Sequence, residues 1–417
     1  MDKKIIKRTL PFILCIVLLV GTIILSMQNT TTSPHESNNN TINKSSRNDY
    51  NIKENEEMKA VWVPFMALED KNGNYTEAEF KSRFDNILAD SKNHGINTMV
   101  VHVRPFGDAL YKSNLFPWSH ILSGTQGNDP GFDPLEYMIE KTHNDNMAFH
   151  AWINPLRIQS NNTPSILCES NLYNKWKTDS DSSNDNWVLD SNGNKYFNPY
   201  YPEVRKVIID GVKEIVENYN VDGIHFDDYF YPTDNYDLDK VSYNEYTSKI
   251  GENAIALSQD QWRIANINTL VSGVYSEIKN IDPSVQFGIS PQANISNDLK
   301  MSADVYSWGS KSGYVDYLCP QLYVNFDHPA LPYNKAADMW KDLITNENVK
   351  YYIGLGLYKA GSSADNGTWQ NSNNIIQKEI EYGRNLNCDG FMLYSWEFLS
   401  NNQTSQEVSN AMKILNN

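Results

Sequence analysis

Cysteine and positive charge are both scarce in this chain. Four cysteines occur in 417 residues, and none belongs to a Cys-x-x-Cys pair. One lies in an apolar N-terminal run, and the other three are an odd number, so neither a disulfide scaffold nor a structural zinc site is expected. Lys and Arg number 35 against 51 Asp and Glu, which gives a net charge of −16. Because nucleic acids and anionic membrane surfaces both select basic patches, neither is expected as the main partner.

Two sequence signatures of catalysis are also missing. The chain has no Gly-x-Ser-x-Gly elbow and no cysteine beside a suitable base, which argues against a serine or cysteine nucleophile. No Gly-x-Gly-x-x-Gly loop follows any predicted strand, which weakens the case for a dinucleotide-binding open sheet. The sequence therefore predicts no cofactor.

The longest apolar run lies at the N-terminus. Four basic side chains fall within the first eight residues, and residues 10–27 are then almost wholly apolar. This run is just long enough to span a bilayer, and no Ala-x-Ala cleavage site follows it. We expect residues 1–27 to be an uncleaved signal anchor with its basic end in the cytoplasm, and a cleaved signal peptide is the alternative. Residues 28–57 are rich in Asn, Ser and Thr and predict a solvated tether, so that residues 58–417 form an exported domain at the cell membrane, or a secreted one.

A strand followed by a helix recurs eight times after the tether. Such alternation favours a closed (β/α)8 barrel, with a doubly wound open sheet as the alternative. The predicted strands are Lys59–Met66, Asn97–Val103, Met147–Ile153, Gly223–Asp227, Val285–Ser290, Val315–Leu322, Tyr351–Leu357 and Gly390–Tyr394. The predicted helices are Thr76–His94, Pro134–Asn146, Pro202–Tyr219, Asp260–Asn280, Asp298–Trp308, Lys335–Thr345, Asn374–Leu386 and Ser405–Leu415.

Polar and aromatic side chains collect where the predicted strands end. In a barrel of this class the chemistry lies at the C-terminal ends of the strands. Strand four ends in Asp227 and Asp228, and strict alternation puts His225 on the face of Asp227 and Asp228 on the opposite face. Carboxylates there are costly unless they are paired, hydrated or functional, and a structural role in capping the loop is the alternative. The residues predicted to bind substrate are Trp62, Arg104, Asp108, His150, Trp152, Asn154, Arg157, His225, Tyr229, Gln292, Gln321, Tyr323, Tyr358 and Trp396.

Paired carboxylates with neighbouring aromatic rings are typical of glycosidic bond hydrolysis, which needs two carboxyl groups. Asp227 is the first catalytic candidate and Asp228 the second. Glu397 is a candidate for the partner acid, because Trp396 beside it could desolvate its carboxyl, and capping of the next loop is the alternative role. The connections after strands three and four, of about 45 and about 30 residues, favour an extended cleft suited to a polymer.

Histidines on strands two, three and four leave a second chemistry open. His102, His150 and His225 fall at similar depth, and with Asp227 they could hold a metal ion, as barrel hydrolases do with ligands from separate strands. The alternative, which we favour, is that these histidines orient carboxylates through hydrogen bonds and that no metal is bound.

Several of these motifs together resemble the glycosyl hydrolase-like 10 family. The residues that carry the resemblance are Ala60–Val63, Val103–Tyr111, Ala151–Arg157, Gly223–Pro232 and Pro320–Tyr323. The resemblance implies a (β/α)8 fold and a bacterial cell-envelope glycosidase, similar to enzymes that act on peptidoglycan glycan strands stripped of their stem peptides.

The chain departs from the pattern of chitinase-type barrels, where an Asp would replace His225 and a Glu would replace Tyr229. It also lacks the nucleophilic Glu that many barrel glycosidases carry at the end of strand seven. We therefore expect an exported glycoside hydrolase of cell-envelope glycan. A non-catalytic glycan-binding barrel of the cell surface and a metal-dependent barrel hydrolase remain the alternatives.

Overall fold

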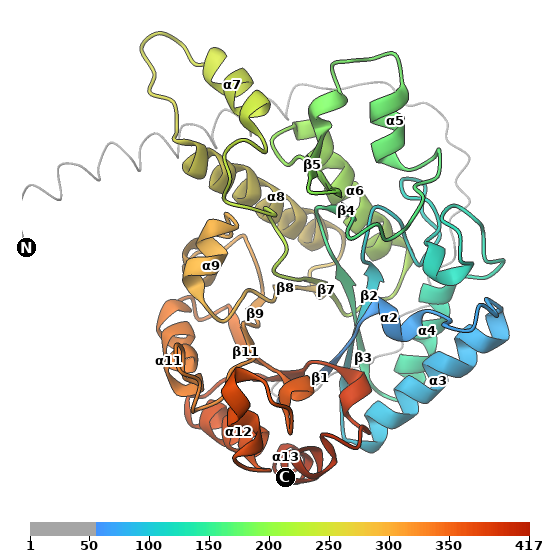
Figure 1. Ribbon diagram of the computed structural model, residues 1–417, viewed down its shortest axis with the longest axis vertical. Helices are drawn as coiled ribbons and strands as arrows, with labels where there is room; N and C mark the ends of the chain where they lie inside the picture. The colour runs from blue at the N-terminus through green and yellow to red at the C-terminus, as the bar shows by residue number, and fades with distance from the viewer. Residues whose placement is uncertain (1–55) are drawn as a thin grey trace, which may run out of the picture. The chain divides into compact units, whose positions relative to one another are not determined.

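The computed structural model describes residues 56–417, and the predicted anchor and nearly all of the tether lie outside the described residues. Eight parallel strands, the sixth in two pieces, form a closed barrel with helices around it (Figure 1). The first strand pairs with the last, where Met58 lies beside Gly390, so the predicted barrel is confirmed and the open sheet is excluded. The strands are β1 (Met58–Val63), β2 (Thr98–Arg104), β3 (Ala148–Ile153), β7 (Gly223–Phe226), β8 (Gln286–Ile289), β9 (Tyr317–Leu318), β10 (Gln321–Leu322), β11 (Lys350–Leu355) and β12 (Gly390–Leu393).

Proline explains two departures from the predicted strands. The segment predicted as strand six is divided into β9 and β10 by Pro320, which has no N–H to give to a neighbouring strand. Strand one ends at Val63 rather than Met66, because Pro64 directly precedes the short helix α2 (Phe65–Leu68).

Seven of the predicted helices are confirmed, and each of their ends lies within two residues of the predicted one. Local caps support them: the Ser258 hydroxyl accepts a hydrogen bond from the backbone N of Gln261, and the Gln261 side chain accepts one from the backbone N of Ser258. These helices are α3 (Glu77–Asn93), α4 (Pro134–Asn144), α6 (Pro202–Asn218), α8 (Gln259–Ile281), α11 (Tyr333–Leu343), α12 (Ile375–Asn385) and α13 (Ser405–Leu415).

The helix predicted over Asp298–Trp308 is wrong as a single element. The chain forms α9 (Ile295–Lys300) and α10 (Val305–Ser310), and Ser302 between them has a φ of 62°. A right-handed helix cannot continue through a residue in the left-handed region.

The two long connections contain structure that the sequence did not predict. After β3, three short strands form an antiparallel sheet in the order β4, β6, β5, and the small helix α7 follows β7. These elements are β4 (Arg157–Gln159), β5 (Val188–Ser191), β6 (Asn194–Phe197), α5 (Leu172–Thr178) and α7 (Lys240–Ser248). Short 3-10 segments are η1 (His120–Leu122), η2 (Asp185–Trp187), η3 (Leu357–Lys359), η4 (Asp365–Gln370), which is kinked, and η5 (Trp396–Phe398).

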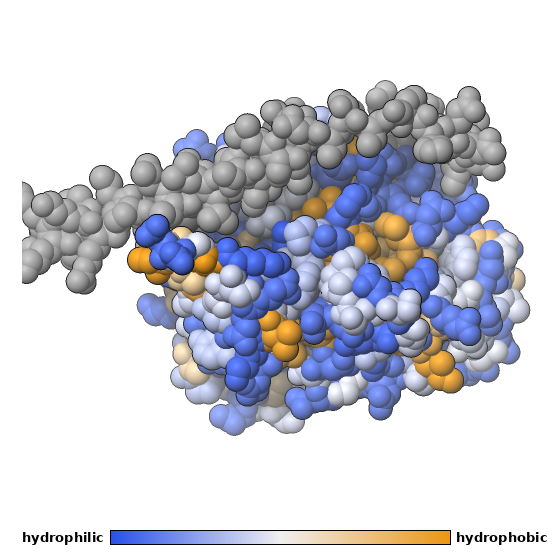
Figure 2. Space-filling model, turned by 90° about the horizontal axis from the view of Figure 1, so that it is seen from above, coloured by the Kyte–Doolittle hydropathy of each residue, from blue (hydrophilic) through white to orange (hydrophobic). Residues whose placement is uncertain are grey.

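Apolar side chains form two layers. The larger layer fills the space between the strands and the surrounding helices. The smaller layer lies inside the barrel and includes Trp62, Trp152 and Tyr317, so the barrel is a packed core rather than a channel. On the face drawn in Figure 2 the coloured residues are mostly hydrophilic and the apolar ones form separate small patches. None of the helices in residues 56–417 is long and apolar enough to cross a membrane.

Candidate active site

A small pocket opens at the C-terminal ends of the barrel strands. Its volume is about 100 Å³, and its lining comes from six of the eight strand ends. The lining residues are Trp62, Trp152, Asp227, Asp228, Tyr229, Ser290, Gln321, Tyr323 and Tyr394. Both carboxylates that end strand four therefore face one pocket. The predicted separation of the two onto opposite faces is wrong, because β7 ends at Phe226 and the alternation of a strand ends with it.

Asp227 is buried at the base of this pocket, with 3% of its surface exposed. Its carboxyl accepts hydrogen bonds from Trp152 Nε1 at 3.2 Å, from Asn154 Nδ2 at 3.2 Å to both oxygens, and from the backbone N of Tyr229 at 3.3 Å. Burial raises the pKa of Asp227 to about 7, and the positive charge of Arg157 opposes that rise. Asp227 can therefore both hold and release a proton near neutrality.

Asp228 follows as the second carboxyl group of the pocket. Its Oδ1 accepts a hydrogen bond from Gln321 Nε2 at 3.0 Å, and the same nitrogen donates to the backbone carbonyl of Ser290 at 2.9 Å. Burial raises the pKa of Asp228, and the hydrogen bond from Gln321 opposes the rise. Gln321 thus links the ends of three strands and fixes the orientation of this carboxylate.

A chain of buried hydrogen bonds supports the pocket from below. Trp62 Nε1 donates to His225 Nε2 at 3.2 Å, His225 Nδ1 lies 3.0 Å from the hydroxyl of Tyr317, and that hydroxyl lies 3.1 Å from His150 Nδ1. Since Nε2 of His225 accepts, its proton is on Nδ1 and goes to Tyr317, whose hydroxyl donates to His150. Burial lowers the pKa of both histidines, so both are neutral at pH 7. His150 and His225 lie beneath the pocket and hold the Trp62 indole.

Two glycines make room for these rings. A Cβ on Gly223 would lie 2.6 Å from His150 Nδ1, and a Cβ on Gly288 would lie 2.0 Å from the ring of Tyr317. Non-bonded heavy atoms do not pack that closely, so a larger residue at either of these two positions would displace the rings that support the pocket.

Aromatic rings form one side of the pocket. Tyr323 lies against Trp62 at 6.4 Å, Tyr394 at 5.5 Å and Tyr358 at 5.9 Å between ring centroids. Such rings can cover the apolar face of a sugar. Tyr394 and Ser290 line the pocket although they were not among the predicted site residues. Each is the last residue of a predicted strand, which is the signal that could have identified them.

Tyr229 also lines the pocket, and Arg157 lies against its ring. Tyr229 is 51% exposed, and the Arg157 guanidinium carbon lies 5.3 Å from the centroid of its ring. Arg157 Nε donates to the carbonyl of Pro105 at 2.9 Å, and its backbone N donates to Asn154 Oδ1 at 3.0 Å. The positive charge is therefore held close to Asp227 without a direct hydrogen bond in the described contacts.

Two predicted site residues lie away from the pocket and are buried in other surroundings. The guanidinium of Arg104 lies over the ring of Phe116 at 4.4 Å and would be 2.3 Å from a Cβ on Gly211, so it packs between the barrel and α6. Asp108 is buried and accepts a hydrogen bond from Gln126 Nε2 at 2.7 Å. Arg104 is the last residue of β2, and Asp108 follows it by four residues.

Three further predicted residues lie near the pocket without lining it. Glu397 accepts a hydrogen bond from Ser395 Oγ at 2.5 Å, and its charge adds to the burial that raises the pKa of Tyr394 to about 12. Trp396 packs against the larger apolar layer, between the strands and the surrounding helices. Gln292 donates its backbone N to Asp298 at 2.8 Å, and its side chain helps to hold down the pKa of Asp228.

The histidines do not form a metal site with Asp227. His102 stacks on the indole of Trp152, with 3.8 Å between ring centroids, while His150 and His225 point to Tyr317. No group of three or more His, Cys, Asp or Glu side chains in residues 56–417 is arranged to hold a metal ion. The donor geometry therefore does not favour the metal-dependent alternative.

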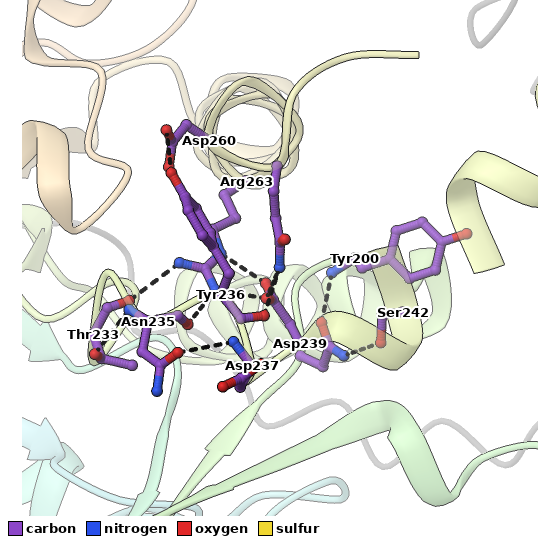
Figure 3. A network of polar contacts seen from close by, with 11 residues as sticks. Tyr200, Thr233, Asn235, Tyr236, Asp237, Asp239, Ser242, Asp260 and Arg263 are labelled. Carbon is purple, nitrogen blue, oxygen red and sulfur yellow. Dashed lines mark hydrogen bonds and ion pairs between the residues drawn. The ribbon is translucent and has the colours of Figure 1, made fainter. Parts of the chain in front are cut away.

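A buried ion pair holds the loop that leaves the pocket after Tyr229. Arg263 of α8 donates from Nε and Nη2 to the two oxygens of Asp239 at 2.8 and 2.6 Å, and both side chains are almost fully buried (Figure 3). The guanidinium also donates to the carbonyls of Thr233 and Asn235 at 3.3 and 2.8 Å. One side chain thus fixes the backbone over residues 233–239.

A closed (β/α)8 barrel with two carboxyl groups and aromatic rings at its C-terminal end defines the class of glycoside hydrolase-like barrels. The chain belongs to the Glycosyl hydrolase-like 10 family, whose model matches residues 57–371. It is 34% identical to the glycosyl hydrolase YngK of Bacillus subtilis over 84% of this chain and 70% of that protein. It is 31% identical to the glycosyl hydrolase DigH of Escherichia coli K12 over 84% of this chain and 86% of that protein.

Solved structures share the fold at low identity. The glycoside hydrolase domain of PgaB (BpsB) from Bordetella bronchiseptica matches with a TM-score of 0.57 and 11% identity, over 86% of this chain and 99% of that one. The alpha-L-fucosidase isoenzyme 2 of Paenibacillus thiaminolyticus matches with a TM-score of 0.52 and 13% identity, over 86% of this chain and 49% of that one. These likenesses concern the barrel alone.

Proposed function

We propose that this chain hydrolyses O-glycosidic bonds in cell-envelope glycan, with peptidoglycan strands that lack stem peptides as the substrate. The observation that carries the proposal is the pair Asp227 and Asp228 on one small pocket, where burial brings the pKa of Asp227 to about 7. Family membership supports a carbohydrate substrate. The choice of peptidoglycan rests on the resemblance of the sequence motifs to the cell-envelope glycosidases of the family.

The proposed reaction uses the two carboxyl groups in different roles. Protonated Asp227 gives its proton to the glycosidic oxygen as the bond from that oxygen to the anomeric carbon breaks. Water adds its hydroxyl to the anomeric carbon, and the remaining proton goes to the second carboxylate, which we assign to Asp228. The face of the sugar is covered by the rings of Trp62, Tyr323 and Tyr394. The positive charge of Arg157 stabilises the Asp227 carboxylate once it has given up its proton.

Release of reducing ends tests the proposal. The full-length chain should release them from denuded peptidoglycan glycan, and Asp227→Asn should reduce that release by a factor of about 10³ or more while binding stays within a few fold. Lys206→Ala, an exposed change on α6, is the matched control for expression and folding and should retain full activity. Inactivity of the wild type on this glycan and on a broad panel of bacterial and plant glycans contradicts the proposal.

The competing function is glycan binding without cleavage. It requires the wild type to bind glycan and release no reducing ends under any condition. Affinity electrophoresis beside the reducing-end assay separates the two functions in one preparation.

A further inference from the structure

A second and larger pocket lies beside α12, against the loop that follows β10. Its volume is about 420 Å³, against about 100 Å³ for the pocket of Asp227. The larger value lies in the range of ligand sites, roughly 300 to 1,000 Å³. Its lining residues that belong to a helix are all on α12, and α11 lies beside α12 in Figure 1.

The two pockets share one loop. Tyr323 lines the pocket of Asp227, and Asn325, Phe326 and Asp327 line the larger one. Because consecutive Cα atoms are about 3.8 Å apart, Tyr323 and Asn325 are separated by about 7.6 Å at most. The larger pocket therefore begins at the mouth of the barrel, beside the aromatic side of the smaller pocket.

From the mouth, the larger pocket extends along α12. Ile375, Lys378, Tyr382 and Asn385 line it at spacings of three and four residues, which is one face of a helix. These ten residue steps correspond to about 15 Å at 1.5 Å per residue. The shape is that of a groove, and we call it the α12 groove.

The chemistry of the α12 groove suits a sugar chain. Phe326 and Tyr382 meet at an interplanar angle of 76° with 6.0 Å between centroids, so they form an apolar corner. The hydroxyl of Tyr382 donates to Asp338, which leaves its ring as the contact surface. Around this corner stand exposed amide and charged side chains, among them Asn371, Lys378 and Asn385. Aromatic surface with polar groups at its edge matches the apolar faces and hydroxyl rim of a pyranose.

The mixed charges of the groove argue against a densely charged polymer as the ligand. Asp327 and Glu381 are balanced in part by Lys378, so no field of one sign extends along the groove. A nucleic acid or another strongly charged polymer would need such a field.

We propose that the α12 groove binds a further stretch of the same glycan strand that the pocket of Asp227 cleaves. The proposal rests on the proposed function and adds a second subsite region to it. A strand held in both places would gain affinity through linkage of the two sites, whereas a short oligosaccharide in the smaller pocket would gain none.

The test compares a long with a short substrate. In the full-length chain, Asn371→Ala/Lys378→Ala removes polar partners from the groove at two exposed positions. We expect a roughly thirtyfold rise in KM for denuded glycan strands, since two lost hydrogen bonds of about 1 kcal/mol each sum to about 2 kcal/mol and each 1.4 kcal/mol is tenfold. The kcat should stay the same, and both constants for a short oligosaccharide should be unchanged. The matched control is Lys206→Ala/Asn218→Ala on α6, on the opposite side of the barrel, which should leave every value at the wild-type level.

Binding and cleavage are read separately, so failure of the two proposals can be told apart. In gels that contain glycan, the wild type should be retarded more than Asn371→Ala/Lys378→Ala, whether or not any cleavage occurs. Greater retardation of the wild type than of the variant, with no cleavage by either protein, supports the groove and contradicts the proposed hydrolysis. Equal retardation and equal KM of variant and wild type overturn the groove proposal, even if the chain cleaves glycan.

Discussion

Asp227 has a charge state that depends on its burial. Its ordinary pKa is 3.8, and burial brings it to about 7 in the folded chain. Between these pH values Asp227 is protonated in the folded chain and charged in the unfolded chain. The contribution of this difference to the free energy of unfolding is therefore fully present below about pH 4 and is lost as pH rises through about 7.

This linkage gives a prediction for stability against pH. The free energy of unfolding of the wild type should fall between pH 5 and pH 8 relative to that of Asp227→Asn, by a few kcal/mol in order of magnitude. Denaturant titrations of both proteins at several pH values measure the difference. Parallel curves for the two proteins would show that Asp227 does not titrate in this range. In the same window, kcat/KM of the wild type should decline as Asp227 loses the proton that it gives to the leaving oxygen.

At the residue scale, Glu397 was predicted from the sequence as the partner acid, whereas the proposed reaction gives that role to Asp227. The Glu397 carboxylate lies beside Tyr394 but does not line the pocket. If it protonates the leaving group, Glu397→Gln should reduce cleavage of natural glycan by two to four orders of magnitude, roughly 10²–10⁴, and spare substrates with a good leaving group. Steady-state rates on both substrate types measure this. Equal loss on both would make Glu397 structural, and full activity on both would remove it from the reaction.

At the scale of elements, the loop from β7 to α8 depends on one buried ion pair. Arg263 and Asp239 are 1% and 0% exposed as side chains, and Arg263 also binds two backbone carbonyls of the loop. Removing one partner of such a pair leaves an uncompensated charge in the interior.

We therefore expect Arg263→Met to lower the free energy of unfolding by about 3–5 kcal/mol, as measured by urea denaturation. The double variant Arg263→Met/Asp239→Leu should recover part of that loss, because no charge is then left unpaired. Lys249→Met is the control: its ion pair with Glu245 is exposed, and its loss should cost less than about 1 kcal/mol. A loss for Arg263→Met no larger than that of the control would contradict a structural role for the pair.

For the whole molecule, export is the main prediction that the described residues do not address. Residues 1–27 should direct the chain to the membrane and leave the barrel outside. Fractionation of cells should find the full-length chain in membranes, and added protease should degrade the barrel in intact cells. The chain without residues 1–27 should remain in the cytoplasmic fraction. A soluble cytoplasmic full-length chain would contradict the anchor, and a shorter mature chain in the medium would identify a cleaved signal peptide instead.

The sequence by itself determined the barrel and its polar end. Strands and helices have different hydrophobic periods, and helix caps and glycines mark their ends, so these signals are local and can be found without tertiary contacts. Asp227, Asp228, Trp62, Trp152 and Gln321 were predicted site residues because each stands at or near the end of a predicted strand, and all five line the pocket.

Only the tertiary structure decided which of those side chains meet. Arg104 and Asp108 also stand at a strand end, yet packing against α6 and against Gln126 takes them out of the pocket. The groove beside α12 combines a loop and a helix some 50 residues apart, and the ion pair of Arg263 combines a loop with a distant helix turn. Such contacts depend on how elements are placed in space, and no local period or motif encodes them.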